Sequence, residues 1–220
     1  MLRLKNIDMS VRDGVSQRHL FSISDLSLQA SQLILCHGPS GSGKTSFLEV
    51  CAGLHQTHQG TVYWHDDLIV NVSDYHGQMC YMTSAPGLFH ELSIHDNLLL
   101  PLKLKGQHIS GIDDKIHHYS TLLSLGGLEM GMSPSVCSSG EKMRISLMRS
   151  LLQEPSVLYL DEPTANCDPG LARVIFSFLQ SHAKEHDRLI VMASHDMTAR
   201  EYAHEVVDMA EYSPVPSGAC

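Results

Sequence analysis

The segment from Gly38 to Thr45, "GPSGSGKT", constrains the fold of this chain more than any other. It lies between the apolar run "LILCH", which is typical of a buried strand, and an apolar pattern at helical spacing. A G-x-x-x-x-G-K-[ST] sequence in that context predicts a loop whose backbone N–H groups hold phosphate oxygens at a helix N-terminus. Gly41 and Gly43 allow the backbone to curl, Lys44 is placed to reach the outer phosphates, and Thr45 to ligate Mg²⁺. The alternative is a glycine-rich turn that only joins a strand to a helix.

Strand-length apolar runs alternate with helical patterns along most of the chain, which predicts a mostly parallel sheet covered on both faces. The predicted strands are residues 33–37, 78–83, 156–160 and 189–194. The predicted helical stripes include Phe47, Leu48, Cys51 and Leu54, and later Leu147, Met148, Leu151 and Leu152.

Two other parts of the chain have different patterns. Residues 1–30 and "TVYWHDDLIV" predict antiparallel strands, with Asp66-Asp67 at a turn. Residues 86–140 contain no convincing strand and are expected to form a helical insertion, in which Ser93 and Asp96 form a capping box. The stripe expected in this insertion is Ile112, Ile116, Tyr119 and Leu123.

Composition excludes several classes of function. A net charge of -9 without a basic run argues against nucleic acid and against direct binding to an anionic membrane surface. We expect neither a signal peptide nor a membrane span, because the best apolar stretch, "NLLLPLKLKG", is interrupted by a proline and two lysines. Six scattered cysteines predict reduced thiols in a cytosol.

A second polar cluster follows the strand in "VLYLDEPT". Two adjacent carboxylates at the end of a buried strand are costly unless a cation or a reaction uses them. We expect Asp161 to face the Mg²⁺ shell and Glu162 to accept a proton from an attacking water. His195, after the next strand, is expected to point into the same crevice. The alternatives are an Asp-Glu pair that caps a helix and a histidine with a core or surface role.

These motifs occur in an order that resembles the ATP-binding subunit of ABC transporters, over nearly the whole chain. The segments that carry the resemblance are the phosphate loop (38–45), the signature segment (137–141), the carboxylate strand (157–162), the "ANCD" loop (165–168) and His195. The resemblance implies an α/β P-loop NTPase of ABC type, with a mostly parallel core sheet, an antiparallel β subdomain and an inserted α-helical subdomain. It implies one domain, residues 1–220, in which 1–85 and 141–212 form the ATP-binding core, 86–140 the insertion with the signature segment, and 213–220 a tail.

The resemblance also implies the ligands and roles of particular residues. ATP and Mg²⁺ are the expected cofactors, and two ATP molecules are expected between the subunits of a head-to-tail homodimer or heterodimer. Catalysis is assigned to Glu162, His195 and Lys44, and the metal to Thr45, Asp161 and Ser84. The nucleotide is expected to contact Gly38, Pro39, Ser40, Gly41, Ser42, Gly43, Lys44, Thr45 and Ser46 of one subunit, and Ser138, Gly140 and Asp168 near the seam with the other.

Ser138 and Glu141 are alternatively an ordinary capping box, and both roles are compatible when ATP is absent. The expected partner is an integral membrane permease that docks around residues 84–100, which would place the chain on the cytoplasmic face of the membrane without a span of its own.

Four positions depart from the family pattern. Ser84 stands where a glutamine is usual, which predicts slow basal hydrolysis. Cys137 and Ser139 replace the usual leucine and glycine of the signature segment. Val11 replaces the aromatic residue that stacks on adenine, and we expect His19 or Phe21 to substitute for it.

Other interpretations stay open. An ATP-gated mechanical or regulatory module that moves no substrate is the main alternative, and a soluble P-loop kinase is disfavoured by the signature segment. "LFHELSIHDNLLLPLKLKG" looks most similar to the branch that serves lipoprotein release and macrolide efflux. The pairs "HQTH" (55–58) and His182 with His186 are expected to be solvated surface histidines rather than metal ligands.

Overall fold

The computed structural model describes residues 1–13, 16–55, 59–75, 77–107 and 109–213. The expected tail, residues 213–220, therefore lies outside the described residues except for Ser213.

A five-stranded parallel sheet forms the centre of the molecule, in the order β6-β7-β8-β3-β9. The four strands predicted from apolar runs are all present. Every residue of β7 and β8 is buried, as expected for strands covered on both faces. The strands are β3 (Gln32–His37), β6 (Met79–Met82), β7 (Val157–Asp161), β8 (Leu189–Ala193) and β9 (Glu205–Asp208).

A four-stranded antiparallel sheet, in the order β2-β1-β4-β5, covers one side of the molecule. Its strands are β1 (Leu2–Asp13), β2 (Ser16–Leu28), β4 (Gln59–Trp64) and β5 (Asp67–Ile69). The turn between β4 and β5 lies at His65 and Asp66, one residue earlier than predicted, because Asp67 already pairs with Trp64.

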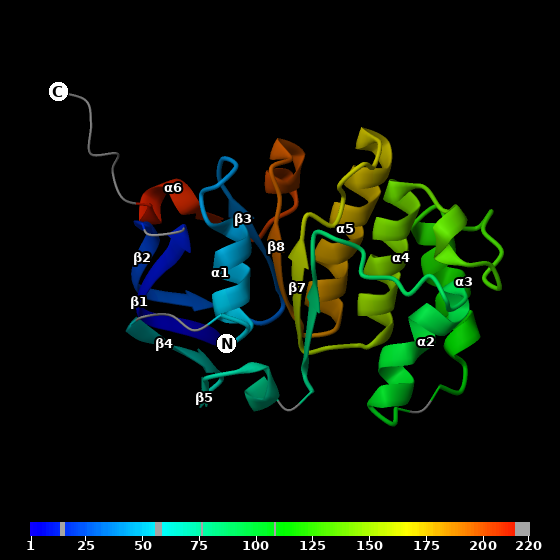
Figure 1. Cartoon of the computed structure of the whole chain (residues 1–220), viewed down its shortest axis with the longest axis horizontal. Helices are drawn as coiled ribbons and strands as arrows, with labels where there is room; N and C mark the ends of the chain where they lie inside the picture. The colour runs from blue at the N-terminus through cyan, green and yellow to red at the C-terminus, as the bar shows by residue number, and fades with distance from the viewer. Residues whose placement is uncertain (14–15, 56–58, 76, 108, 214–220) are drawn as a thin grey trace.

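The two faces of the parallel sheet contact different layers, because successive side chains of a strand point to opposite faces. Leu33 and Leu35 of β3 pack with the helices α2 to α5, whereas Ile34 and Cys36 pack with α1 and the antiparallel sheet. Figure 1 shows α1 and the antiparallel sheet on one side of the parallel strands and α2, α3 and α4 on the other.

α1 (Lys44–Cys51) buries Phe47, Leu48 and Cys51, as the predicted stripe requires. Leu54, predicted on the same stripe, is 51% exposed because the helix ends before it.

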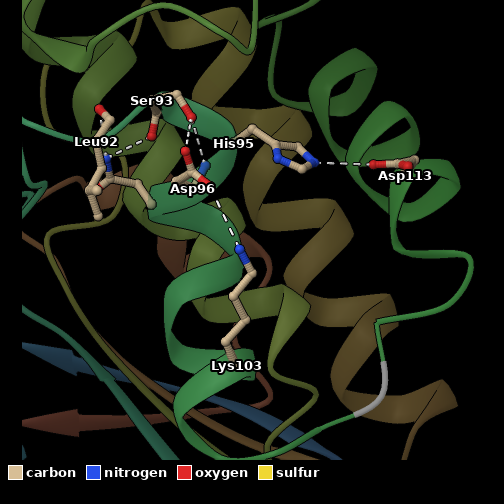
Figure 2. Close-up of polar contacts among 7 residues, drawn as sticks. Leu92, Ser93, His95, Asp96, Lys103 and Asp113 are labelled. Carbon is tan, nitrogen blue, oxygen red and sulfur yellow. Dashed lines mark hydrogen bonds and ion pairs between the residues drawn. The ribbon is translucent and has the colours of Figure 1, made fainter.

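The predicted helical insertion contains α2 (Ile94–Leu104), α3 (Ile112–Leu122) and the 3₁₀ turn η2 (Pro134–Val136), and its described residues form no strand. Ser93 caps α2, since its hydroxyl accepts a hydrogen bond from the Asp96 N–H and donates one to the Asp96 carboxylate. The predicted capping box is only half formed, because the Asp96 carboxylate bonds to the Ser93 hydroxyl and not to the Ser93 N–H. His95 contacts Asp113 at 3.2 Å and so joins α2 to α3, while Asp96 lies 3.7 Å from Lys103 (Figure 2). The predicted stripe on α3 is buried.

α4 (Ser139–Leu152) runs without a break across the predicted boundary at residue 141, so the insertion and the core share one helix. α5 (Pro169–Glu185) packs beside it in the same apolar cluster. The remaining elements are η1 (Val72–Tyr75), η3 (Met197–Glu201) and α6 (Met209–Tyr212). Among the described residues, no helix combines the length and the apolarity needed to cross a bilayer.

Candidate functional site

The phosphate loop joins β3 to α1, and its three glycines, Gly38, Gly41 and Gly43, have positive φ angles that other residues rarely adopt. Gly38 and Gly43 have φ angles of 154° and 93°. A Cβ atom on Gly38 would lie 2.6 Å from the Ser42 hydroxyl, and one on Gly43 would lie 3.0 Å from the Phe21 ring. Both positions are therefore closed to larger residues by backbone conformation and by space.

Polar groups of this loop are arranged to receive an anion. The Lys44 ammonium donates to the carbonyl oxygens of Gly38 at 2.9 Å and Pro39 at 3.2 Å, so it lies across the loop. The Ser42 hydroxyl is buried and has no hydrogen-bond partner among the described residues. This oxygen faces Gly38, and Ser42 does not line the cavity beside Lys44. The groups available to an anion are therefore the Lys44 ammonium and the loop N–H groups. The loop therefore fits the polyphosphate that the sequence predicted.

Asp161 ends β7 opposite the start of α1. Its Oδ2 atom accepts a hydrogen bond of 2.9 Å from the Thr45 hydroxyl, and Ser84 lines the same cavity as this carboxyl group. Burial raises the pKa of Asp161, and the Thr45 hydroxyl partly opposes that shift. The structure thus brings together the three oxygen donors predicted to hold Mg²⁺, and hard oxygen ligands of this kind fit that ion.

Glu162 follows Asp161 directly after the end of β7 and contacts a different residue. Its Oε2 atom lies 3.0 Å from Nδ1 of His195, whose side chain is 76% exposed. Glu162 has a φ angle of 53°, a left-handed conformation that is strained in residues other than glycine, and its N–H donates to the Ala193 carbonyl at 3.0 Å. The fold therefore holds the Glu162 backbone in a conformation that a glutamate rarely adopts.

These side chains surround one cavity of about 440 Å³. It is lined by Val11, Arg18, Leu20, Ser40, Gly41, Gly43, Lys44, Thr45, Ser46, Ser84, Asp161 and Glu162. A second cavity, of about 510 Å³, adjoins Glu162 and His195 and includes Asn166 and Cys167. The catalytic and metal-binding residues predicted from the sequence therefore lie together.

The end of the first cavity beside Val11 differs from the prediction. His19 or Phe21 was expected there in place of an aromatic residue at position 11, but neither lines the cavity. Phe21 is fully buried, with its ring against Phe47 and Gly43. His19 bonds to Ser22 at 2.9 Å and lies 3.4 Å from Asp8.

The residues that take this place, Arg18 and Leu20, were missed by sequence reasoning. The signal that could have found Arg18 is the hairpin register, which pairs it with Val11.

The signature segment does not line this cavity, which agrees with a role toward another subunit. Ser138 and Glu141 form a complete capping box at the start of α4, so the structural alternative is confirmed. Ser138 and Ser139 are exposed, while Gly140 is buried and a Cβ atom on it would lie 2.9 Å from the Asn166 carbonyl. Asp168 caps α5 by accepting a hydrogen bond of 3.0 Å from the Leu171 N–H.

Comparison with known proteins identifies the family to which this fold and site belong. The family model described as "ABC transporter" matches residues 21–165. The chain belongs to the ABC transporter family. It carries the ATP-binding domain of that family.

Curated relatives of this ABC domain are named as subunits for both import and export. It is 31% identical to the sulfate/thiosulfate import ATP-binding protein CysA of Halalkalibacterium halodurans, over 84% of this chain and 52% of that protein. It is also 31% identical to the cytochrome c biogenesis ATP-binding export protein CcmA of Nitrosospira multiformis, over 89% of this chain and 92% of that protein. The chain spans about half the length of several of its curated relatives.

A solved structure of the ATP-binding cassette MJ0796, in a dimeric post-hydrolysis state bound to ADP and Pi, has the same fold. Its TM-score is 0.84 at 21% identity, with 94% of each chain covered.

The predictions for the two histidine pairs of this ABC domain have different outcomes. His182 is buried rather than solvated, and burial together with the neighbouring Arg188 cation lowers its pKa to about 4. Its Nε2 atom, 2.5 Å from Arg188 Nη1, is therefore a neutral acceptor. Residues 56–58 of "HQTH" lie outside the described residues. Burial raises the pKa of the Cys137 and Cys167 thiols, which favours the interpretation that they are packed side chains.

Proposed function

We propose that this ABC domain binds and hydrolyses ATP and that the closure of two such domains around ATP drives a membrane transporter. The observation that carries the proposal is the single cavity that contains Lys44, Thr45, Asp161 and Glu162, with His195 in contact with Glu162. Three separate parts of the sequence, after β3, β7 and β8, supply these groups at one edge of the sheet. That edge is where open α/β sheets bind ligands.

The proposed chemistry follows from the position of each side chain. Lys44 exchanges the carbonyls of Gly38 and Pro39 for the outer phosphates, which gives a charge-assisted contact. Thr45, Asp161 and Ser84 would hold Mg²⁺, whose charge stabilises the phosphates during transfer.

The γ-phosphate is attacked by water in this proposal. Glu162 orients the water and accepts its proton, and His195 contacts both Glu162 and the γ-phosphate. The strained backbone of Glu162 keeps its carboxylate at the mouth of the cavity.

The second half of each site would come from another subunit. The N-terminus of α4 has exposed serines and a positive helix end, so Ser138 and the Gly140 N–H are proposed to bind the γ-phosphate across a homodimer or heterodimer seam. Asp168 lies at the start of α5, beside the loop that lines the second cavity, and is proposed to lie near the same seam.

The proposed partner is an integral membrane permease that docks around residues 84–100 and holds the domain at the cytoplasmic face. Phe89 is exposed in this segment. Ser84, at the start of the segment, lines the same cavity as Asp161, so docking there would affect the proposed metal site. On the sequence of this segment, we also propose that the domain belongs to the branch that serves lipoprotein release and macrolide efflux. Since relatives are named for import and for export, we propose no direction.

Phosphate release from Mg·ATP tests the proposed reaction. Lys44→Ala should abolish ATP binding, whereas Glu162→Gln should keep binding but reduce hydrolysis by about 100-fold or more, because general base and water positioning are lost. His118→Ala on α3 is a matched control, and its rate should equal that of the unaltered chain. Equal hydrolysis by the unaltered chain and the Glu162→Gln variant would contradict the proposal.

Substrate-dependent stimulation of this rate in the complex with the permease separates transport from the main alternative. An ATP-gated module that moves no substrate would hydrolyse ATP without such stimulation.

A further inference from the structure

The cavity that holds the phosphate loop has an end without an aromatic ring. None of the described residues that line it is a phenylalanine, tyrosine, tryptophan or histidine. Phe21, the nearest aromatic in sequence, is fully buried beneath the loop. If the phosphates of a nucleotide occupy the loop, the base needs another surface on which to rest.

Arg18 is the cationic side chain at this end. Its Nη2 atom donates to the Gly41 carbonyl at 3.2 Å, so the guanidinium lies beside the phosphate loop and lines the cavity. Within the described part of the chain, no carboxylate forms an ion pair with it. A guanidinium held by one carbonyl hydrogen bond is free to turn toward a ligand at little cost.

The residues beside Arg18 favour a base over a phosphate as its ligand. Val11 pairs with Arg18 across the hairpin, and Leu20 follows it on β2, so the flanking side chains are aliphatic. Aliphatic neighbours suit the aromatic ring of a base, whereas the phosphates already have Lys44 and the loop N–H groups as partners. A planar guanidinium also stacks on aromatic rings, which the compact ammonium of lysine does less well.

We propose that Arg18 binds the nucleobase by stacking its guanidinium on the ring face, with Val11 and Leu20 as the apolar edge of the subsite. Every base has a ring face, and the described lining offers no group committed to reading one base edge. Adenine and guanine nucleotides should therefore bind with similar affinity. This inference rests on the proposed function, since it needs a nucleotide in the phosphate loop.

Calorimetric titration of the purified chain with Mg·ADP, Mg·GDP and Mg·tripolyphosphate tests the inference. Arg18→Ala should weaken both nucleotides by about threefold to thirtyfold, the range for a cation–π contact, and leave tripolyphosphate unchanged. Arg18→Tyr should restore nucleotide affinity, because a ring replaces the guanidinium, and tyrosine suits a strand. Arg18→Lys should behave like the alanine variant. Arg3→Ala, on β1 and paired with Asp25 outside the cavity, is the matched control and should bind like the unaltered chain.

Two results would overturn the inference alone. One is nucleotide affinity that is unchanged in Arg18→Ala while Lys44→Ala abolishes binding. The other is a loss of tripolyphosphate affinity in Arg18→Ala that Arg18→Lys restores, which would make Arg18 a phosphate contact. If the unaltered chain binds neither nucleotide, the proposed function fails together with the inference.

Discussion

Asp161 shows at the scale of one residue how the site opposes stability. Its carboxylate is buried, and it accepts a hydrogen bond from the Thr45 hydroxyl rather than from a cation. Burial raises its pKa, so the ionised form is less stable in the folded chain than in water. Functional sites commonly hold such groups at the expense of folding free energy.

Asp161→Asn should therefore stabilise the chain in the absence of nucleotide and metal. Because the folded-state pKa is raised, the ionised group destabilises the fold as pH rises above its ordinary value near 4, and the uncharged amide removes this effect. We expect an increase in the melting temperature of about 2–4 °C near pH 7, and a smaller difference near pH 4. Thermal unfolding at both pH values measures the two differences.

Asp114→Asn is the matched control, since Asp114 is an exposed carboxylate on α3. A melting temperature of Asp161→Asn that falls below that of the unaltered chain at neutral pH would count against the account of this carboxylate.

At the scale of elements, α4 combines a structural and a proposed ligand-binding role in the same N-cap. Ser138 and Glu141 satisfy each other's backbone N–H groups in the capping box, and the helix then runs into the core beside α5. The buried Gly140 lets the Asn166 carbonyl approach, which links the signature segment to the loop before α5. Both segments are thus held together at the proposed seam.

Substitutions at Ser138 separate these two roles. Ser138→Ala should lower the free energy of unfolding by about 1 kcal/mol, because the cap is lost. Ser138→Asp should keep the cap and the stability, but its charge should repel the γ-phosphate and reduce ATP hydrolysis by the dimer. Chemical denaturation and phosphate release measure the two effects. Full hydrolysis by the aspartate variant would show that Ser138 acts only as a cap.

The sequence predicted elements and motif positions well, because these depend on neighbours along the chain. Buried strands were visible as apolar runs, and the capping box of Ser138 and Glu141 as a short polar pattern. The prediction that His19 or Phe21 lies beside the base failed because of tertiary structure. The β1–β2 register shifts between Met9 and Ser10, so simple alternation fails to place His19, Leu20 and Phe21.

The prediction for His182 was wrong because the two histidines were considered apart from the helix that carries them. His182 lies on the buried stripe of α5, together with Ala172, Ile175, Phe176 and Leu179, and helical spacing could have revealed it.

At the scale of the whole molecule, the parallel sheet gathers the chemistry at one edge. The phosphate loop, Asp161 with Glu162, and His195 follow three neighbouring strands, β3, β7 and β8. The α4 N-terminus and Asp168 lie outside the cavity of their own chain, and we propose that they complete the site of a second copy or a related subunit. Each complete site would then need two domains.

Sedimentation of the purified Glu162→Gln variant with Mg·ATP or Mg·ADP tests this requirement most directly. Blocked hydrolysis should trap the closed state, so the variant should sediment as a dimer with Mg·ATP and as a monomer with Mg·ADP. Adding Ser138→Asp should restore the monomer, because each half-site then repels the nucleotide of the other. A Glu162→Gln variant that binds Mg·ATP yet remains strictly monomeric would contradict the account.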